Sequence, residues 1–210
     1  MEKKASAILF DLGGVILNLD YNRTINAFKS LGEESFAELY SQAQQNAIFD
    51  RIETGEITEE YFRKYLISFL GDKVTNEMVD EAWNAMLLDL PQERIDFLHE
   101  LKKNYKIYLF SNTNAIHLRA FQNIIKNQYG DAQLLERIFD KTYYSHLIHN
   151  RKPNATAFQY ILDDLNLRAD EVIFIDDSIQ HVEGAKSVGI NAYHLVDIDV
   201  MNLLKGVLEK

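Results

Sequence analysis

The sequence predicts an α/β protein with a doubly wound parallel sheet and an inserted helical segment. Short apolar segments alternate with helical patterns along most of the chain, which favours parallel strands with helices on both faces of the sheet. The alternation stops between about residues 18 and 90, where the patterns are helical throughout. We therefore assign residues 1–17 and 91–210 to an α/β core domain, and residues 18–90 to a helical cap domain above the sheet.

The expected strands are short and mostly apolar, as is typical of a sheet buried on both faces. The first strand runs directly into Asp11 and a pair of glycines. The expected strands lie at 8–10, 106–110, 142–145, 172–175 and 191–195. Between them, apolar spacing predicts helices that begin at Pro91, near Ala115, at Asn154 and near Gln180.

Capping residues divide the helical segment into separate helices. Asp20 can cap a first helix that ends before Gly32. Thr58 can cap another helix that ends at Gly71, and Thr75 can cap a third. The third helix carries an apolar stripe at helical spacing, formed by Met78, Val79, Ala82, Trp83, Met86 and Leu87. We interpret this stripe as core packing, with a place for Trp83 in a substrate pocket as the alternative.

Composition excludes several classes of function. The formal net charge is −10 and no basic patch is visible, so we expect neither nucleic acid nor an anionic membrane as a partner. The absence of cysteine excludes disulfides, thiolate catalysis and cysteine-bound zinc. The first apolar run ends at Asp11, too early for a signal-peptide core or a membrane span. We expect a soluble, cytoplasmic monomer.

Polar side chains follow four of the expected strands. They are Asp11, Ser111, Lys152 and the pair Asp176 and Asp177. The carboxyl ends of parallel strands share one crevice, so these residues are expected to meet in space. A carboxylate nucleophile, a hydroxyl, an ammonium group and further carboxylates are what phosphoryl transfer to an aspartate requires. Taken singly, each residue could instead be a turn, a cap or a surface ion pair.

The three carboxylates predict a divalent cation. Without one, Asp11, Asp176 and Asp177 would repel one another and an incoming phosphate. Magnesium prefers oxygen ligands and is commonly bound by one or two carboxylates together with the phosphate of a substrate. We therefore expect Mg²⁺ as the cofactor and a small phosphorylated molecule as the substrate.

Four segments, taken together, resemble the motifs of the haloacid dehalogenase-like hydrolases. They are Phe-Asp-Leu-Gly-Gly-Val at 10–15, Leu-Phe-Ser-Asn-Thr-Asn at 109–114, Arg-Lys-Pro at 151–153 and Phe-Ile-Asp-Asp-Ser-Ile-Gln-His-Val-Glu-Gly-Ala at 174–185. The resemblance covers essentially the whole chain and implies a Rossmann-like core with a helical cap. Within the family, segments 20–23 and 54–58 resemble bacterial sugar-phosphate phosphatases, including the α-glucose-1-phosphate type.

The resemblance also implies roles for individual residues. Asp11 would be the nucleophile and Lys152 the cation that steadies it and the phosphate. Ser111 would bind the phosphate, and Asn112 would add an amide to the phosphate or the substrate. The metal would be bound by Asp11, the main-chain carbonyl of Gly13, Asp177 and, directly or through water, Asp176.

Gly13 is a departure from the family pattern. Most phosphatases of the family carry an aspartate there, which protonates the leaving group and then activates water. General acid–base assistance of this kind contributes about 10²–10⁴-fold to rate. A more acidic leaving group, such as an anomeric sugar hydroxyl, would need less assistance. Alternatively, Asp20 could act as the acid, although its assignment as a helix cap is the reading we favour.

Three other functions compete with a sugar-phosphate phosphatase. A metal-free 2-haloacid dehalogenase would not need the missing acid, but the pair Asp176 and Asp177 argues against it. A phosphomutase would need the acid more strongly. A non-catalytic phosphate-binding relative is supported by Gly13 and opposed by the presence of Asp11 and Lys152. We assign no histidine to the site, and we leave Arg23 and Arg151 open between substrate contact and solvation.

Overall fold

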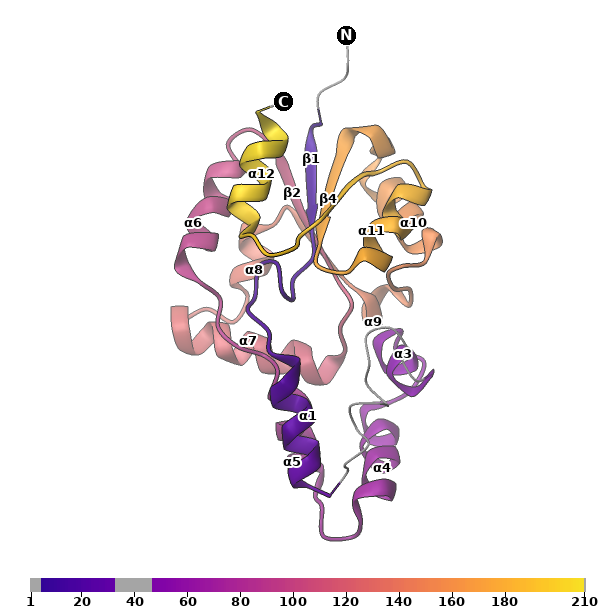
Figure 1. Ribbon diagram of the computed structural model, residues 1–210. Helices are drawn as coiled ribbons and strands as arrows, with labels where there is room; N and C mark the ends of the chain where they lie inside the picture. The colour runs from indigo at the N-terminus through magenta and orange to yellow at the C-terminus, as the bar shows by residue number, and fades with distance from the viewer. Residues whose placement is uncertain (1–4, 33–46, 210) are drawn as a thin grey trace.

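A computed structural model describes residues 5–32 and 47–209. Within these residues, five parallel strands form one sheet in the order β3-β2-β1-β4-β5 (Figure 1). The strands are β1 (Ala7–Phe10), β2 (Lys106–Ser111), β3 (Lys141–Tyr144), β4 (Val172–Asp176) and β5 (Asn191–His194). The doubly wound parallel sheet predicted from the sequence is therefore confirmed.

The central strand β1 shows why the sheet is buried on both faces. Its side chains alternate between two apolar clusters: Ile8 and Phe10 face one, and Ala7 and Leu9 face the other. All four residues are at most 1% exposed. The first cluster is covered by α6 (Gln92–Leu101), α7 (Ala115–Tyr129), α8 (Leu134–Ile138) and α12 (Val200–Leu208). The second is covered by α10 (Ala155–Leu165) and α11 (Ile179–Ser187).

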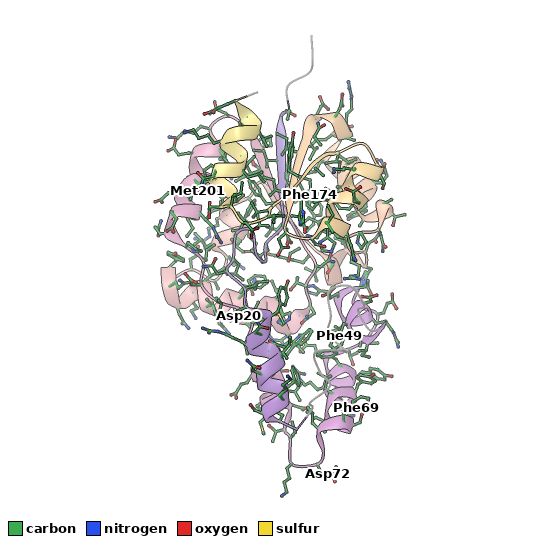
Figure 2. The ribbon with its side chains drawn as sticks, viewed as in Figure 1. Asp20, Phe49, Phe69, Asp72, Phe174 and Met201 are labelled. Carbon is green, nitrogen blue, oxygen red and sulfur yellow. The ribbon has the colours of Figure 1, made fainter. Side chains whose placement is uncertain are left out.

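In the part of the chain that the structure describes, four further helices form a separate lobe beyond the carboxyl ends of the strands (Figure 1). They are α1 (Tyr21–Ser30), α3 (Ala47–Glu53), α4 (Glu59–Leu70) and α5 (Asn76–Asn84). The lobe has its own apolar core, in which Trp83 is fully buried and stacks on Phe49 at a centroid distance of 5.3 Å. Figure 2 shows Phe49 in this lobe and Phe174 in the sheet. We propose that this lobe is the cap, with the boundaries 18–90 predicted above; its residues 33–46 lie outside the described part.

The predicted caps of the lobe are confirmed. Asp20 accepts a hydrogen bond from the backbone N–H of Asn22, and Thr58 accepts one from Tyr61. Thr75 caps α5 in the same way. Gly71 ends α4 with a φ of 91°, a conformation that favours glycine. Asp20 lies where the chain enters α1 (Figure 2).

The apolar stripe of the last cap helix extends past the end of that helix. α5 ends at Asn84, so the prediction that Met86 and Leu87 are helical is wrong. The hydroxyl of Thr24 donates to the carbonyl of Trp83 and accepts from the N–H of Met86, which replaces the next helical hydrogen bonds. Leu87 instead forms an antiparallel bridge with Leu19 as the chain returns to the sheet.

Three α-helices within the described ranges were not predicted. They are α8, α9 (Ser145–Ile148) and α12. The first two span 5 and 4 residues, too few for helical periodicity to be recognised. Because α9 begins at Ser145, that residue follows β3 rather than ending it. Among the described residues, none belongs to a helix with the length and apolarity needed to cross a bilayer.

We expect Trp83→Ala to lower the free energy of unfolding by about 3–5 kcal/mol, because it empties the centre of the lobe. Chemical denaturation monitored by circular dichroism measures this. Phe69 is 52% exposed near the end of the lobe, so Phe69→Ala is the control and should cost less than about 1 kcal/mol. Equal losses for the two variants would show that the stacked aromatic cluster does not stabilise the lobe.

Candidate active site

Asp11 lies at the centre of the carboxyl edge of the sheet. Its N–H donates to the carbonyl of Ile175 at 3.0 Å, which continues the pairing of β1 with β4. Ser111 ends β2 and Asp176 ends β4, on either side of β1. The parallel order of these strands therefore brings together side chains that are far apart in the sequence, as predicted.

Lys152 is the buried cation of the site. Its Nζ lies 2.6 Å from Oδ1 of Asp11 and 2.7 Å from Oδ2 of Asp176, and the residue is 0% exposed. The ammonium also lies 5.3 Å from the ring centroid of Phe110 and 5.6 Å from that of Phe174. Burial opposes the charged ammonium, but the two carboxylates outweigh it and raise the pKa of Lys152 above its usual range.

Asn112 fixes the main chain of Lys152. Its side-chain amide donates to the carbonyl of Lys152 at 2.9 Å, and its Oδ1 accepts from the N–H of the same residue at 2.9 Å. These two bonds connect the end of β2 to the loop that carries the lysine. The predicted contact of Asn112 with phosphate stays a prediction. Ser111 is buried and lines the cleft, and its hydroxyl makes a long 3.5 Å contact with the carbonyl of Asn112.

Asp11, Asp176 and Asp177 can hold a metal ion. Each offers one carboxylate oxygen, and these atoms lie within 4.8 Å of one another. Three carboxylates against one ammonium leave an excess of negative charge that a divalent cation would neutralise, and oxygen donors suit magnesium. Gly14 makes room for the cluster: its φ is 72°, and a Cβ there would lie 2.3 Å from Oδ2 of Asp177.

The carboxylates differ in their pKa because their surroundings differ. Burial would raise the pKa of Asp176, but Lys152 and the hydrogen bond from His181 outweigh burial and hold it below its usual range. Burial raises the pKa of Asp11, and the nearby ammonium of Lys152 only partly offsets this rise. Burial, followed by repulsion from the other two carboxylates, raises the pKa of Asp177 to about 7. A bound cation would reduce this repulsion between the carboxylates.

A cleft of about 340 Å³ lies between the sheet edge and the helical lobe. The side of the core contributes Asp11, Ser111, Asn112, His117, Asp177 and His181, among others. The lobe contributes Tyr21, Asp50, Glu53, Met86 and Leu87. A molecule that fills this cleft is therefore in contact with both parts of the chain.

The space beside Gly13 is filled by Leu19. A Cβ at position 13 would lie 2.5 Å from Cδ1 of Leu19, so no side chain fits there unless the leucine moves. Asp20, the alternative acid, caps α1 and lies 3.6 Å from Arg23 in an ion pair, with both side chains well exposed. It does not line the cleft. The assignment of Asp20 as a helix cap is therefore confirmed.

Several cleft residues were not assigned by sequence reasoning. Arg151 forms ion pairs with Asp50 and Glu53, and its side chain is only 12% exposed, so solvation is the wrong interpretation for it. His181 lies 2.9 Å from Asp176. His117 stacks on Trp83, and its Nδ1 lies 2.8 Å from Oδ1 of Asn84. The pairings of Arg151 and His117 join residues distant in sequence. Two residues offered a local signal: Arg151 is adjacent to Lys152, and His181 lies five residues after Asp176 in the same motif.

The structure combines a Rossmann-like sheet, a buried lysine and a carboxylate cluster at the edge of that sheet, and an overlying helical lobe. This is the arrangement that the sequence resemblance implies for haloacid dehalogenase-like hydrolases. Residues 5–189 match the model of the haloacid dehalogenase-like hydrolase family. The chain belongs to this family.

Solved structures and curated relatives agree with this assignment. The magnesium and phosphate complex of a mutant of the HAD family enzyme BT-2542 from Bacteroides thetaiotaomicron has a TM-score of 0.87 and 33% identity, over 95% of this chain and 98% of that one. A predicted HAD-like hydrolase from Porphyromonas gingivalis also has a TM-score of 0.87, with 27% identity over 99% and 100% of the chains. D-ribitol-5-phosphate phosphatase from B. thetaiotaomicron is 28% identical over 89% of both chains.

We predict that His117 makes the protein less stable in acid. Burial lowers its pKa to about 3 from 6.5, so between these values the unfolded chain binds a proton that the folded chain does not. Stability contributed by the neutral imidazole is therefore lost as the pH falls below 6.5, by up to about 1.4 kcal/mol per pH unit.

Denaturant unfolding of wild type and His117→Gln across this range measures the effect. The variant should show a shallower loss of stability with falling pH. His99 is exposed, and His99→Gln should leave the slope as it is in wild type. If the free energy of unfolding fell with pH equally steeply in wild type and His117→Gln, His117 would not be the source of the acid sensitivity.

Proposed function

We propose that this hydrolase is a magnesium-dependent phosphatase that cleaves a small phosphorylated metabolite, a sugar or polyol phosphate, through an aspartyl-phosphate intermediate. The observation that carries the proposal is Asp11 at the end of β1, 2.6 Å from the buried ammonium of Lys152 and beside two further carboxylates. Phosphatase activity in the named relative from B. thetaiotaomicron supports it.

In this proposal Asp11 is the nucleophile. A carboxylate oxygen of Asp11 forms a bond to phosphorus while the bond from phosphorus to the leaving-group oxygen breaks. Water then attacks the phosphorus of the acyl phosphate, which releases inorganic phosphate and restores the carboxylate. Because burial raises the pKa of Asp11, the ammonium of Lys152 is needed to favour the ionised, nucleophilic form.

Other residues bind the transferring group. The hydroxyl of Ser111 and the side-chain amide of Asn112 line the cleft next to Asp11 and can donate to phosphate oxygens. Asp11, Asp176, Asp177 and the main-chain carbonyl of Gly13 would hold Mg²⁺, which neutralises charge on the phosphate when bound. His181 and the N–H of Ser178 orient Asp176 for this task, at 2.9 and 2.8 Å from its Oδ1.

The leaving group must be protonated without a carboxyl at position 13, where Leu19 occupies the space. A leaving group more acidic than a plain alcohol needs less protonation, which favours sugar 1-phosphates as one substrate class. The name of the relative points instead to the phosphate of a primary alcohol, D-ribitol 5-phosphate. The substrate panel should contain both classes.

Two other functions fit less well. A metal-free dehalogenase does not require a metal site. Here Asp177 lies beside Asp11 and Asp176, with one carboxylate oxygen of each within 4.8 Å of the others, as a metal site would require. A non-catalytic phosphate-binding protein has no need to place an ammonium 2.6 Å from a carboxylate that faces the cleft. Both are decided by the following experiment.

We expect purified protein to release inorganic phosphate from members of a sugar- and polyol-phosphate panel only when Mg²⁺ is present. Asp11→Asn should lower kcat by at least about 10³-fold, because it removes the nucleophile. Glu60→Gln, a change at an exposed residue of α4, is the matched control and should leave kcat unchanged. Binding of phosphate without release from any substrate would favour the binding protein, and metal-independent chloride release from chloroacetate would favour the dehalogenase.

A further inference from the structure

A second charged cluster lines the same cleft as Asp11. It consists of Asp50 and Glu53 from α3, which we call the cap carboxylates, and of Arg151. Nη1 of Arg151 lies 2.6 Å from Oδ1 of Asp50, and Nη2 lies 2.9 Å from Oε2 of Glu53. The side chains of Arg151 and Glu53 are 12% and 9% exposed, and all three residues line the cleft.

The end of α3 is docked onto the loop that carries Lys152. The carbonyl of Thr54 accepts a hydrogen bond from Nδ1 of His149 at 2.9 Å. Gly55 has a φ of 69°, and a Cβ there would lie 2.7 Å from the carbonyl of His146. These contacts, together with Arg151, fix the cap carboxylates relative to Lys152 and hence to Asp11.

The charge of this cluster opposes a second anion. Two carboxylates face one guanidinium, which is already shared between them. Burial raises the pKa of Glu53, while Arg151 favours its ionised form. With Glu53 ionised the cluster carries a net negative charge, and with Glu53 protonated it is neutral; in neither state is it cationic. A second phosphate or a carboxylate on the substrate would lose its hydration here without gaining a cation.

Hydroxyl groups of a substrate can bind to the cap carboxylates. Carboxylate oxygens accept charge-assisted hydrogen bonds from hydroxyls, and Arg151 holds the cap carboxylates in place to do so. His117 offers a further acceptor in the cleft. Burial lowers its pKa to about 3 and so keeps the ring neutral, and with Nδ1 donating to Oδ1 of Asn84 the other ring nitrogen accepts. The cleft beyond the phosphate therefore offers acceptors to a molecule that carries several hydroxyl donors.

We infer that Asp50 and Glu53, positioned by Arg151, bind hydroxyl groups of the leaving group and select monophosphates of neutral polyols or sugars over phosphates that carry a second anionic group. This inference rests on the proposed phosphatase function and names the substrate class that the helical lobe selects. The cap carboxylates determine specificity, whereas Asp11 performs the reaction.

The test compares two substrates that differ in one group, glucitol 6-phosphate and 6-phosphogluconate, in which a carboxylate replaces a terminal CH₂OH. The measured quantity is the ratio of their kcat/KM values within one protein, so any general loss of activity cancels. Wild type should prefer the neutral substrate by at least about tenfold, since like charges in contact are strongly disfavoured. Glu53→Gln and Asp50→Asn should each lower the ratio several-fold, and the double variant should bring it near one.

Glu60→Gln is the matched control, because it removes the same charge from an exposed part of the lobe and should leave the ratio unchanged. A ratio that stays at the wild-type value in the double variant would overturn the inference while phosphate release shows that the phosphatase function stands. No release by wild type from either substrate or from p-nitrophenyl phosphate would instead overturn the proposed function, and the inference with it.

Discussion

The ammonium of Lys152 between Asp11 and Asp176 is the interaction on which the site depends. A buried ammonium is costly unless it is paired, and here two carboxylates lie 2.6 and 2.7 Å from it while two aromatic rings cover it. The pairing requires β1 and β4 to be neighbours and the lysine loop to cross their carboxyl ends. Removing one partner would leave a buried charge uncompensated. Because the pairing also depends on which strands are neighbours, the order of the sheet and the geometry of the site constrain each other.

The same loop also organises the helical lobe. Lys152 points into the sheet edge, and Arg151, its neighbour in sequence, pairs with Asp50 and Glu53 of α3. Two adjacent residues thus connect Asp11 to the cap carboxylates on the other part of the cleft. In the proposed mechanism, placement of the phosphate and recognition of the leaving group would therefore be coupled through one short stretch of backbone, which Asn112 fixes from β2.

The sheet and the convergence of Asp11, Ser111, Lys152 and Asp176 could be predicted, because strand ends are marked locally and parallel strands share one edge. Helix caps such as Asp20 and Thr58 were predictable for the same reason. The ion pairs of Arg151 were not, since its partners lie about a hundred residues away and no pattern joins them. Likewise, nothing in the sequence near Gly13 indicates that Leu19 fills the adjacent space, because that contact depends on how the chain turns into the lobe.

In the proposed mechanism, Asp11 carries the phosphoryl group during turnover. The most direct test of this role is rapid mixing of the protein with Mg²⁺ and a ³²P-labelled substrate found active in the panel, followed by acid quench and peptide mapping. We expect label on the peptide that contains Asp11, and we expect hydroxylamine to remove this label because hydroxylamine cleaves an acyl phosphate. Label on another residue would contradict the role of Asp11 as nucleophile. Absence of label from the protein while turnover proceeds, when the intermediate should be populated, would contradict it as well.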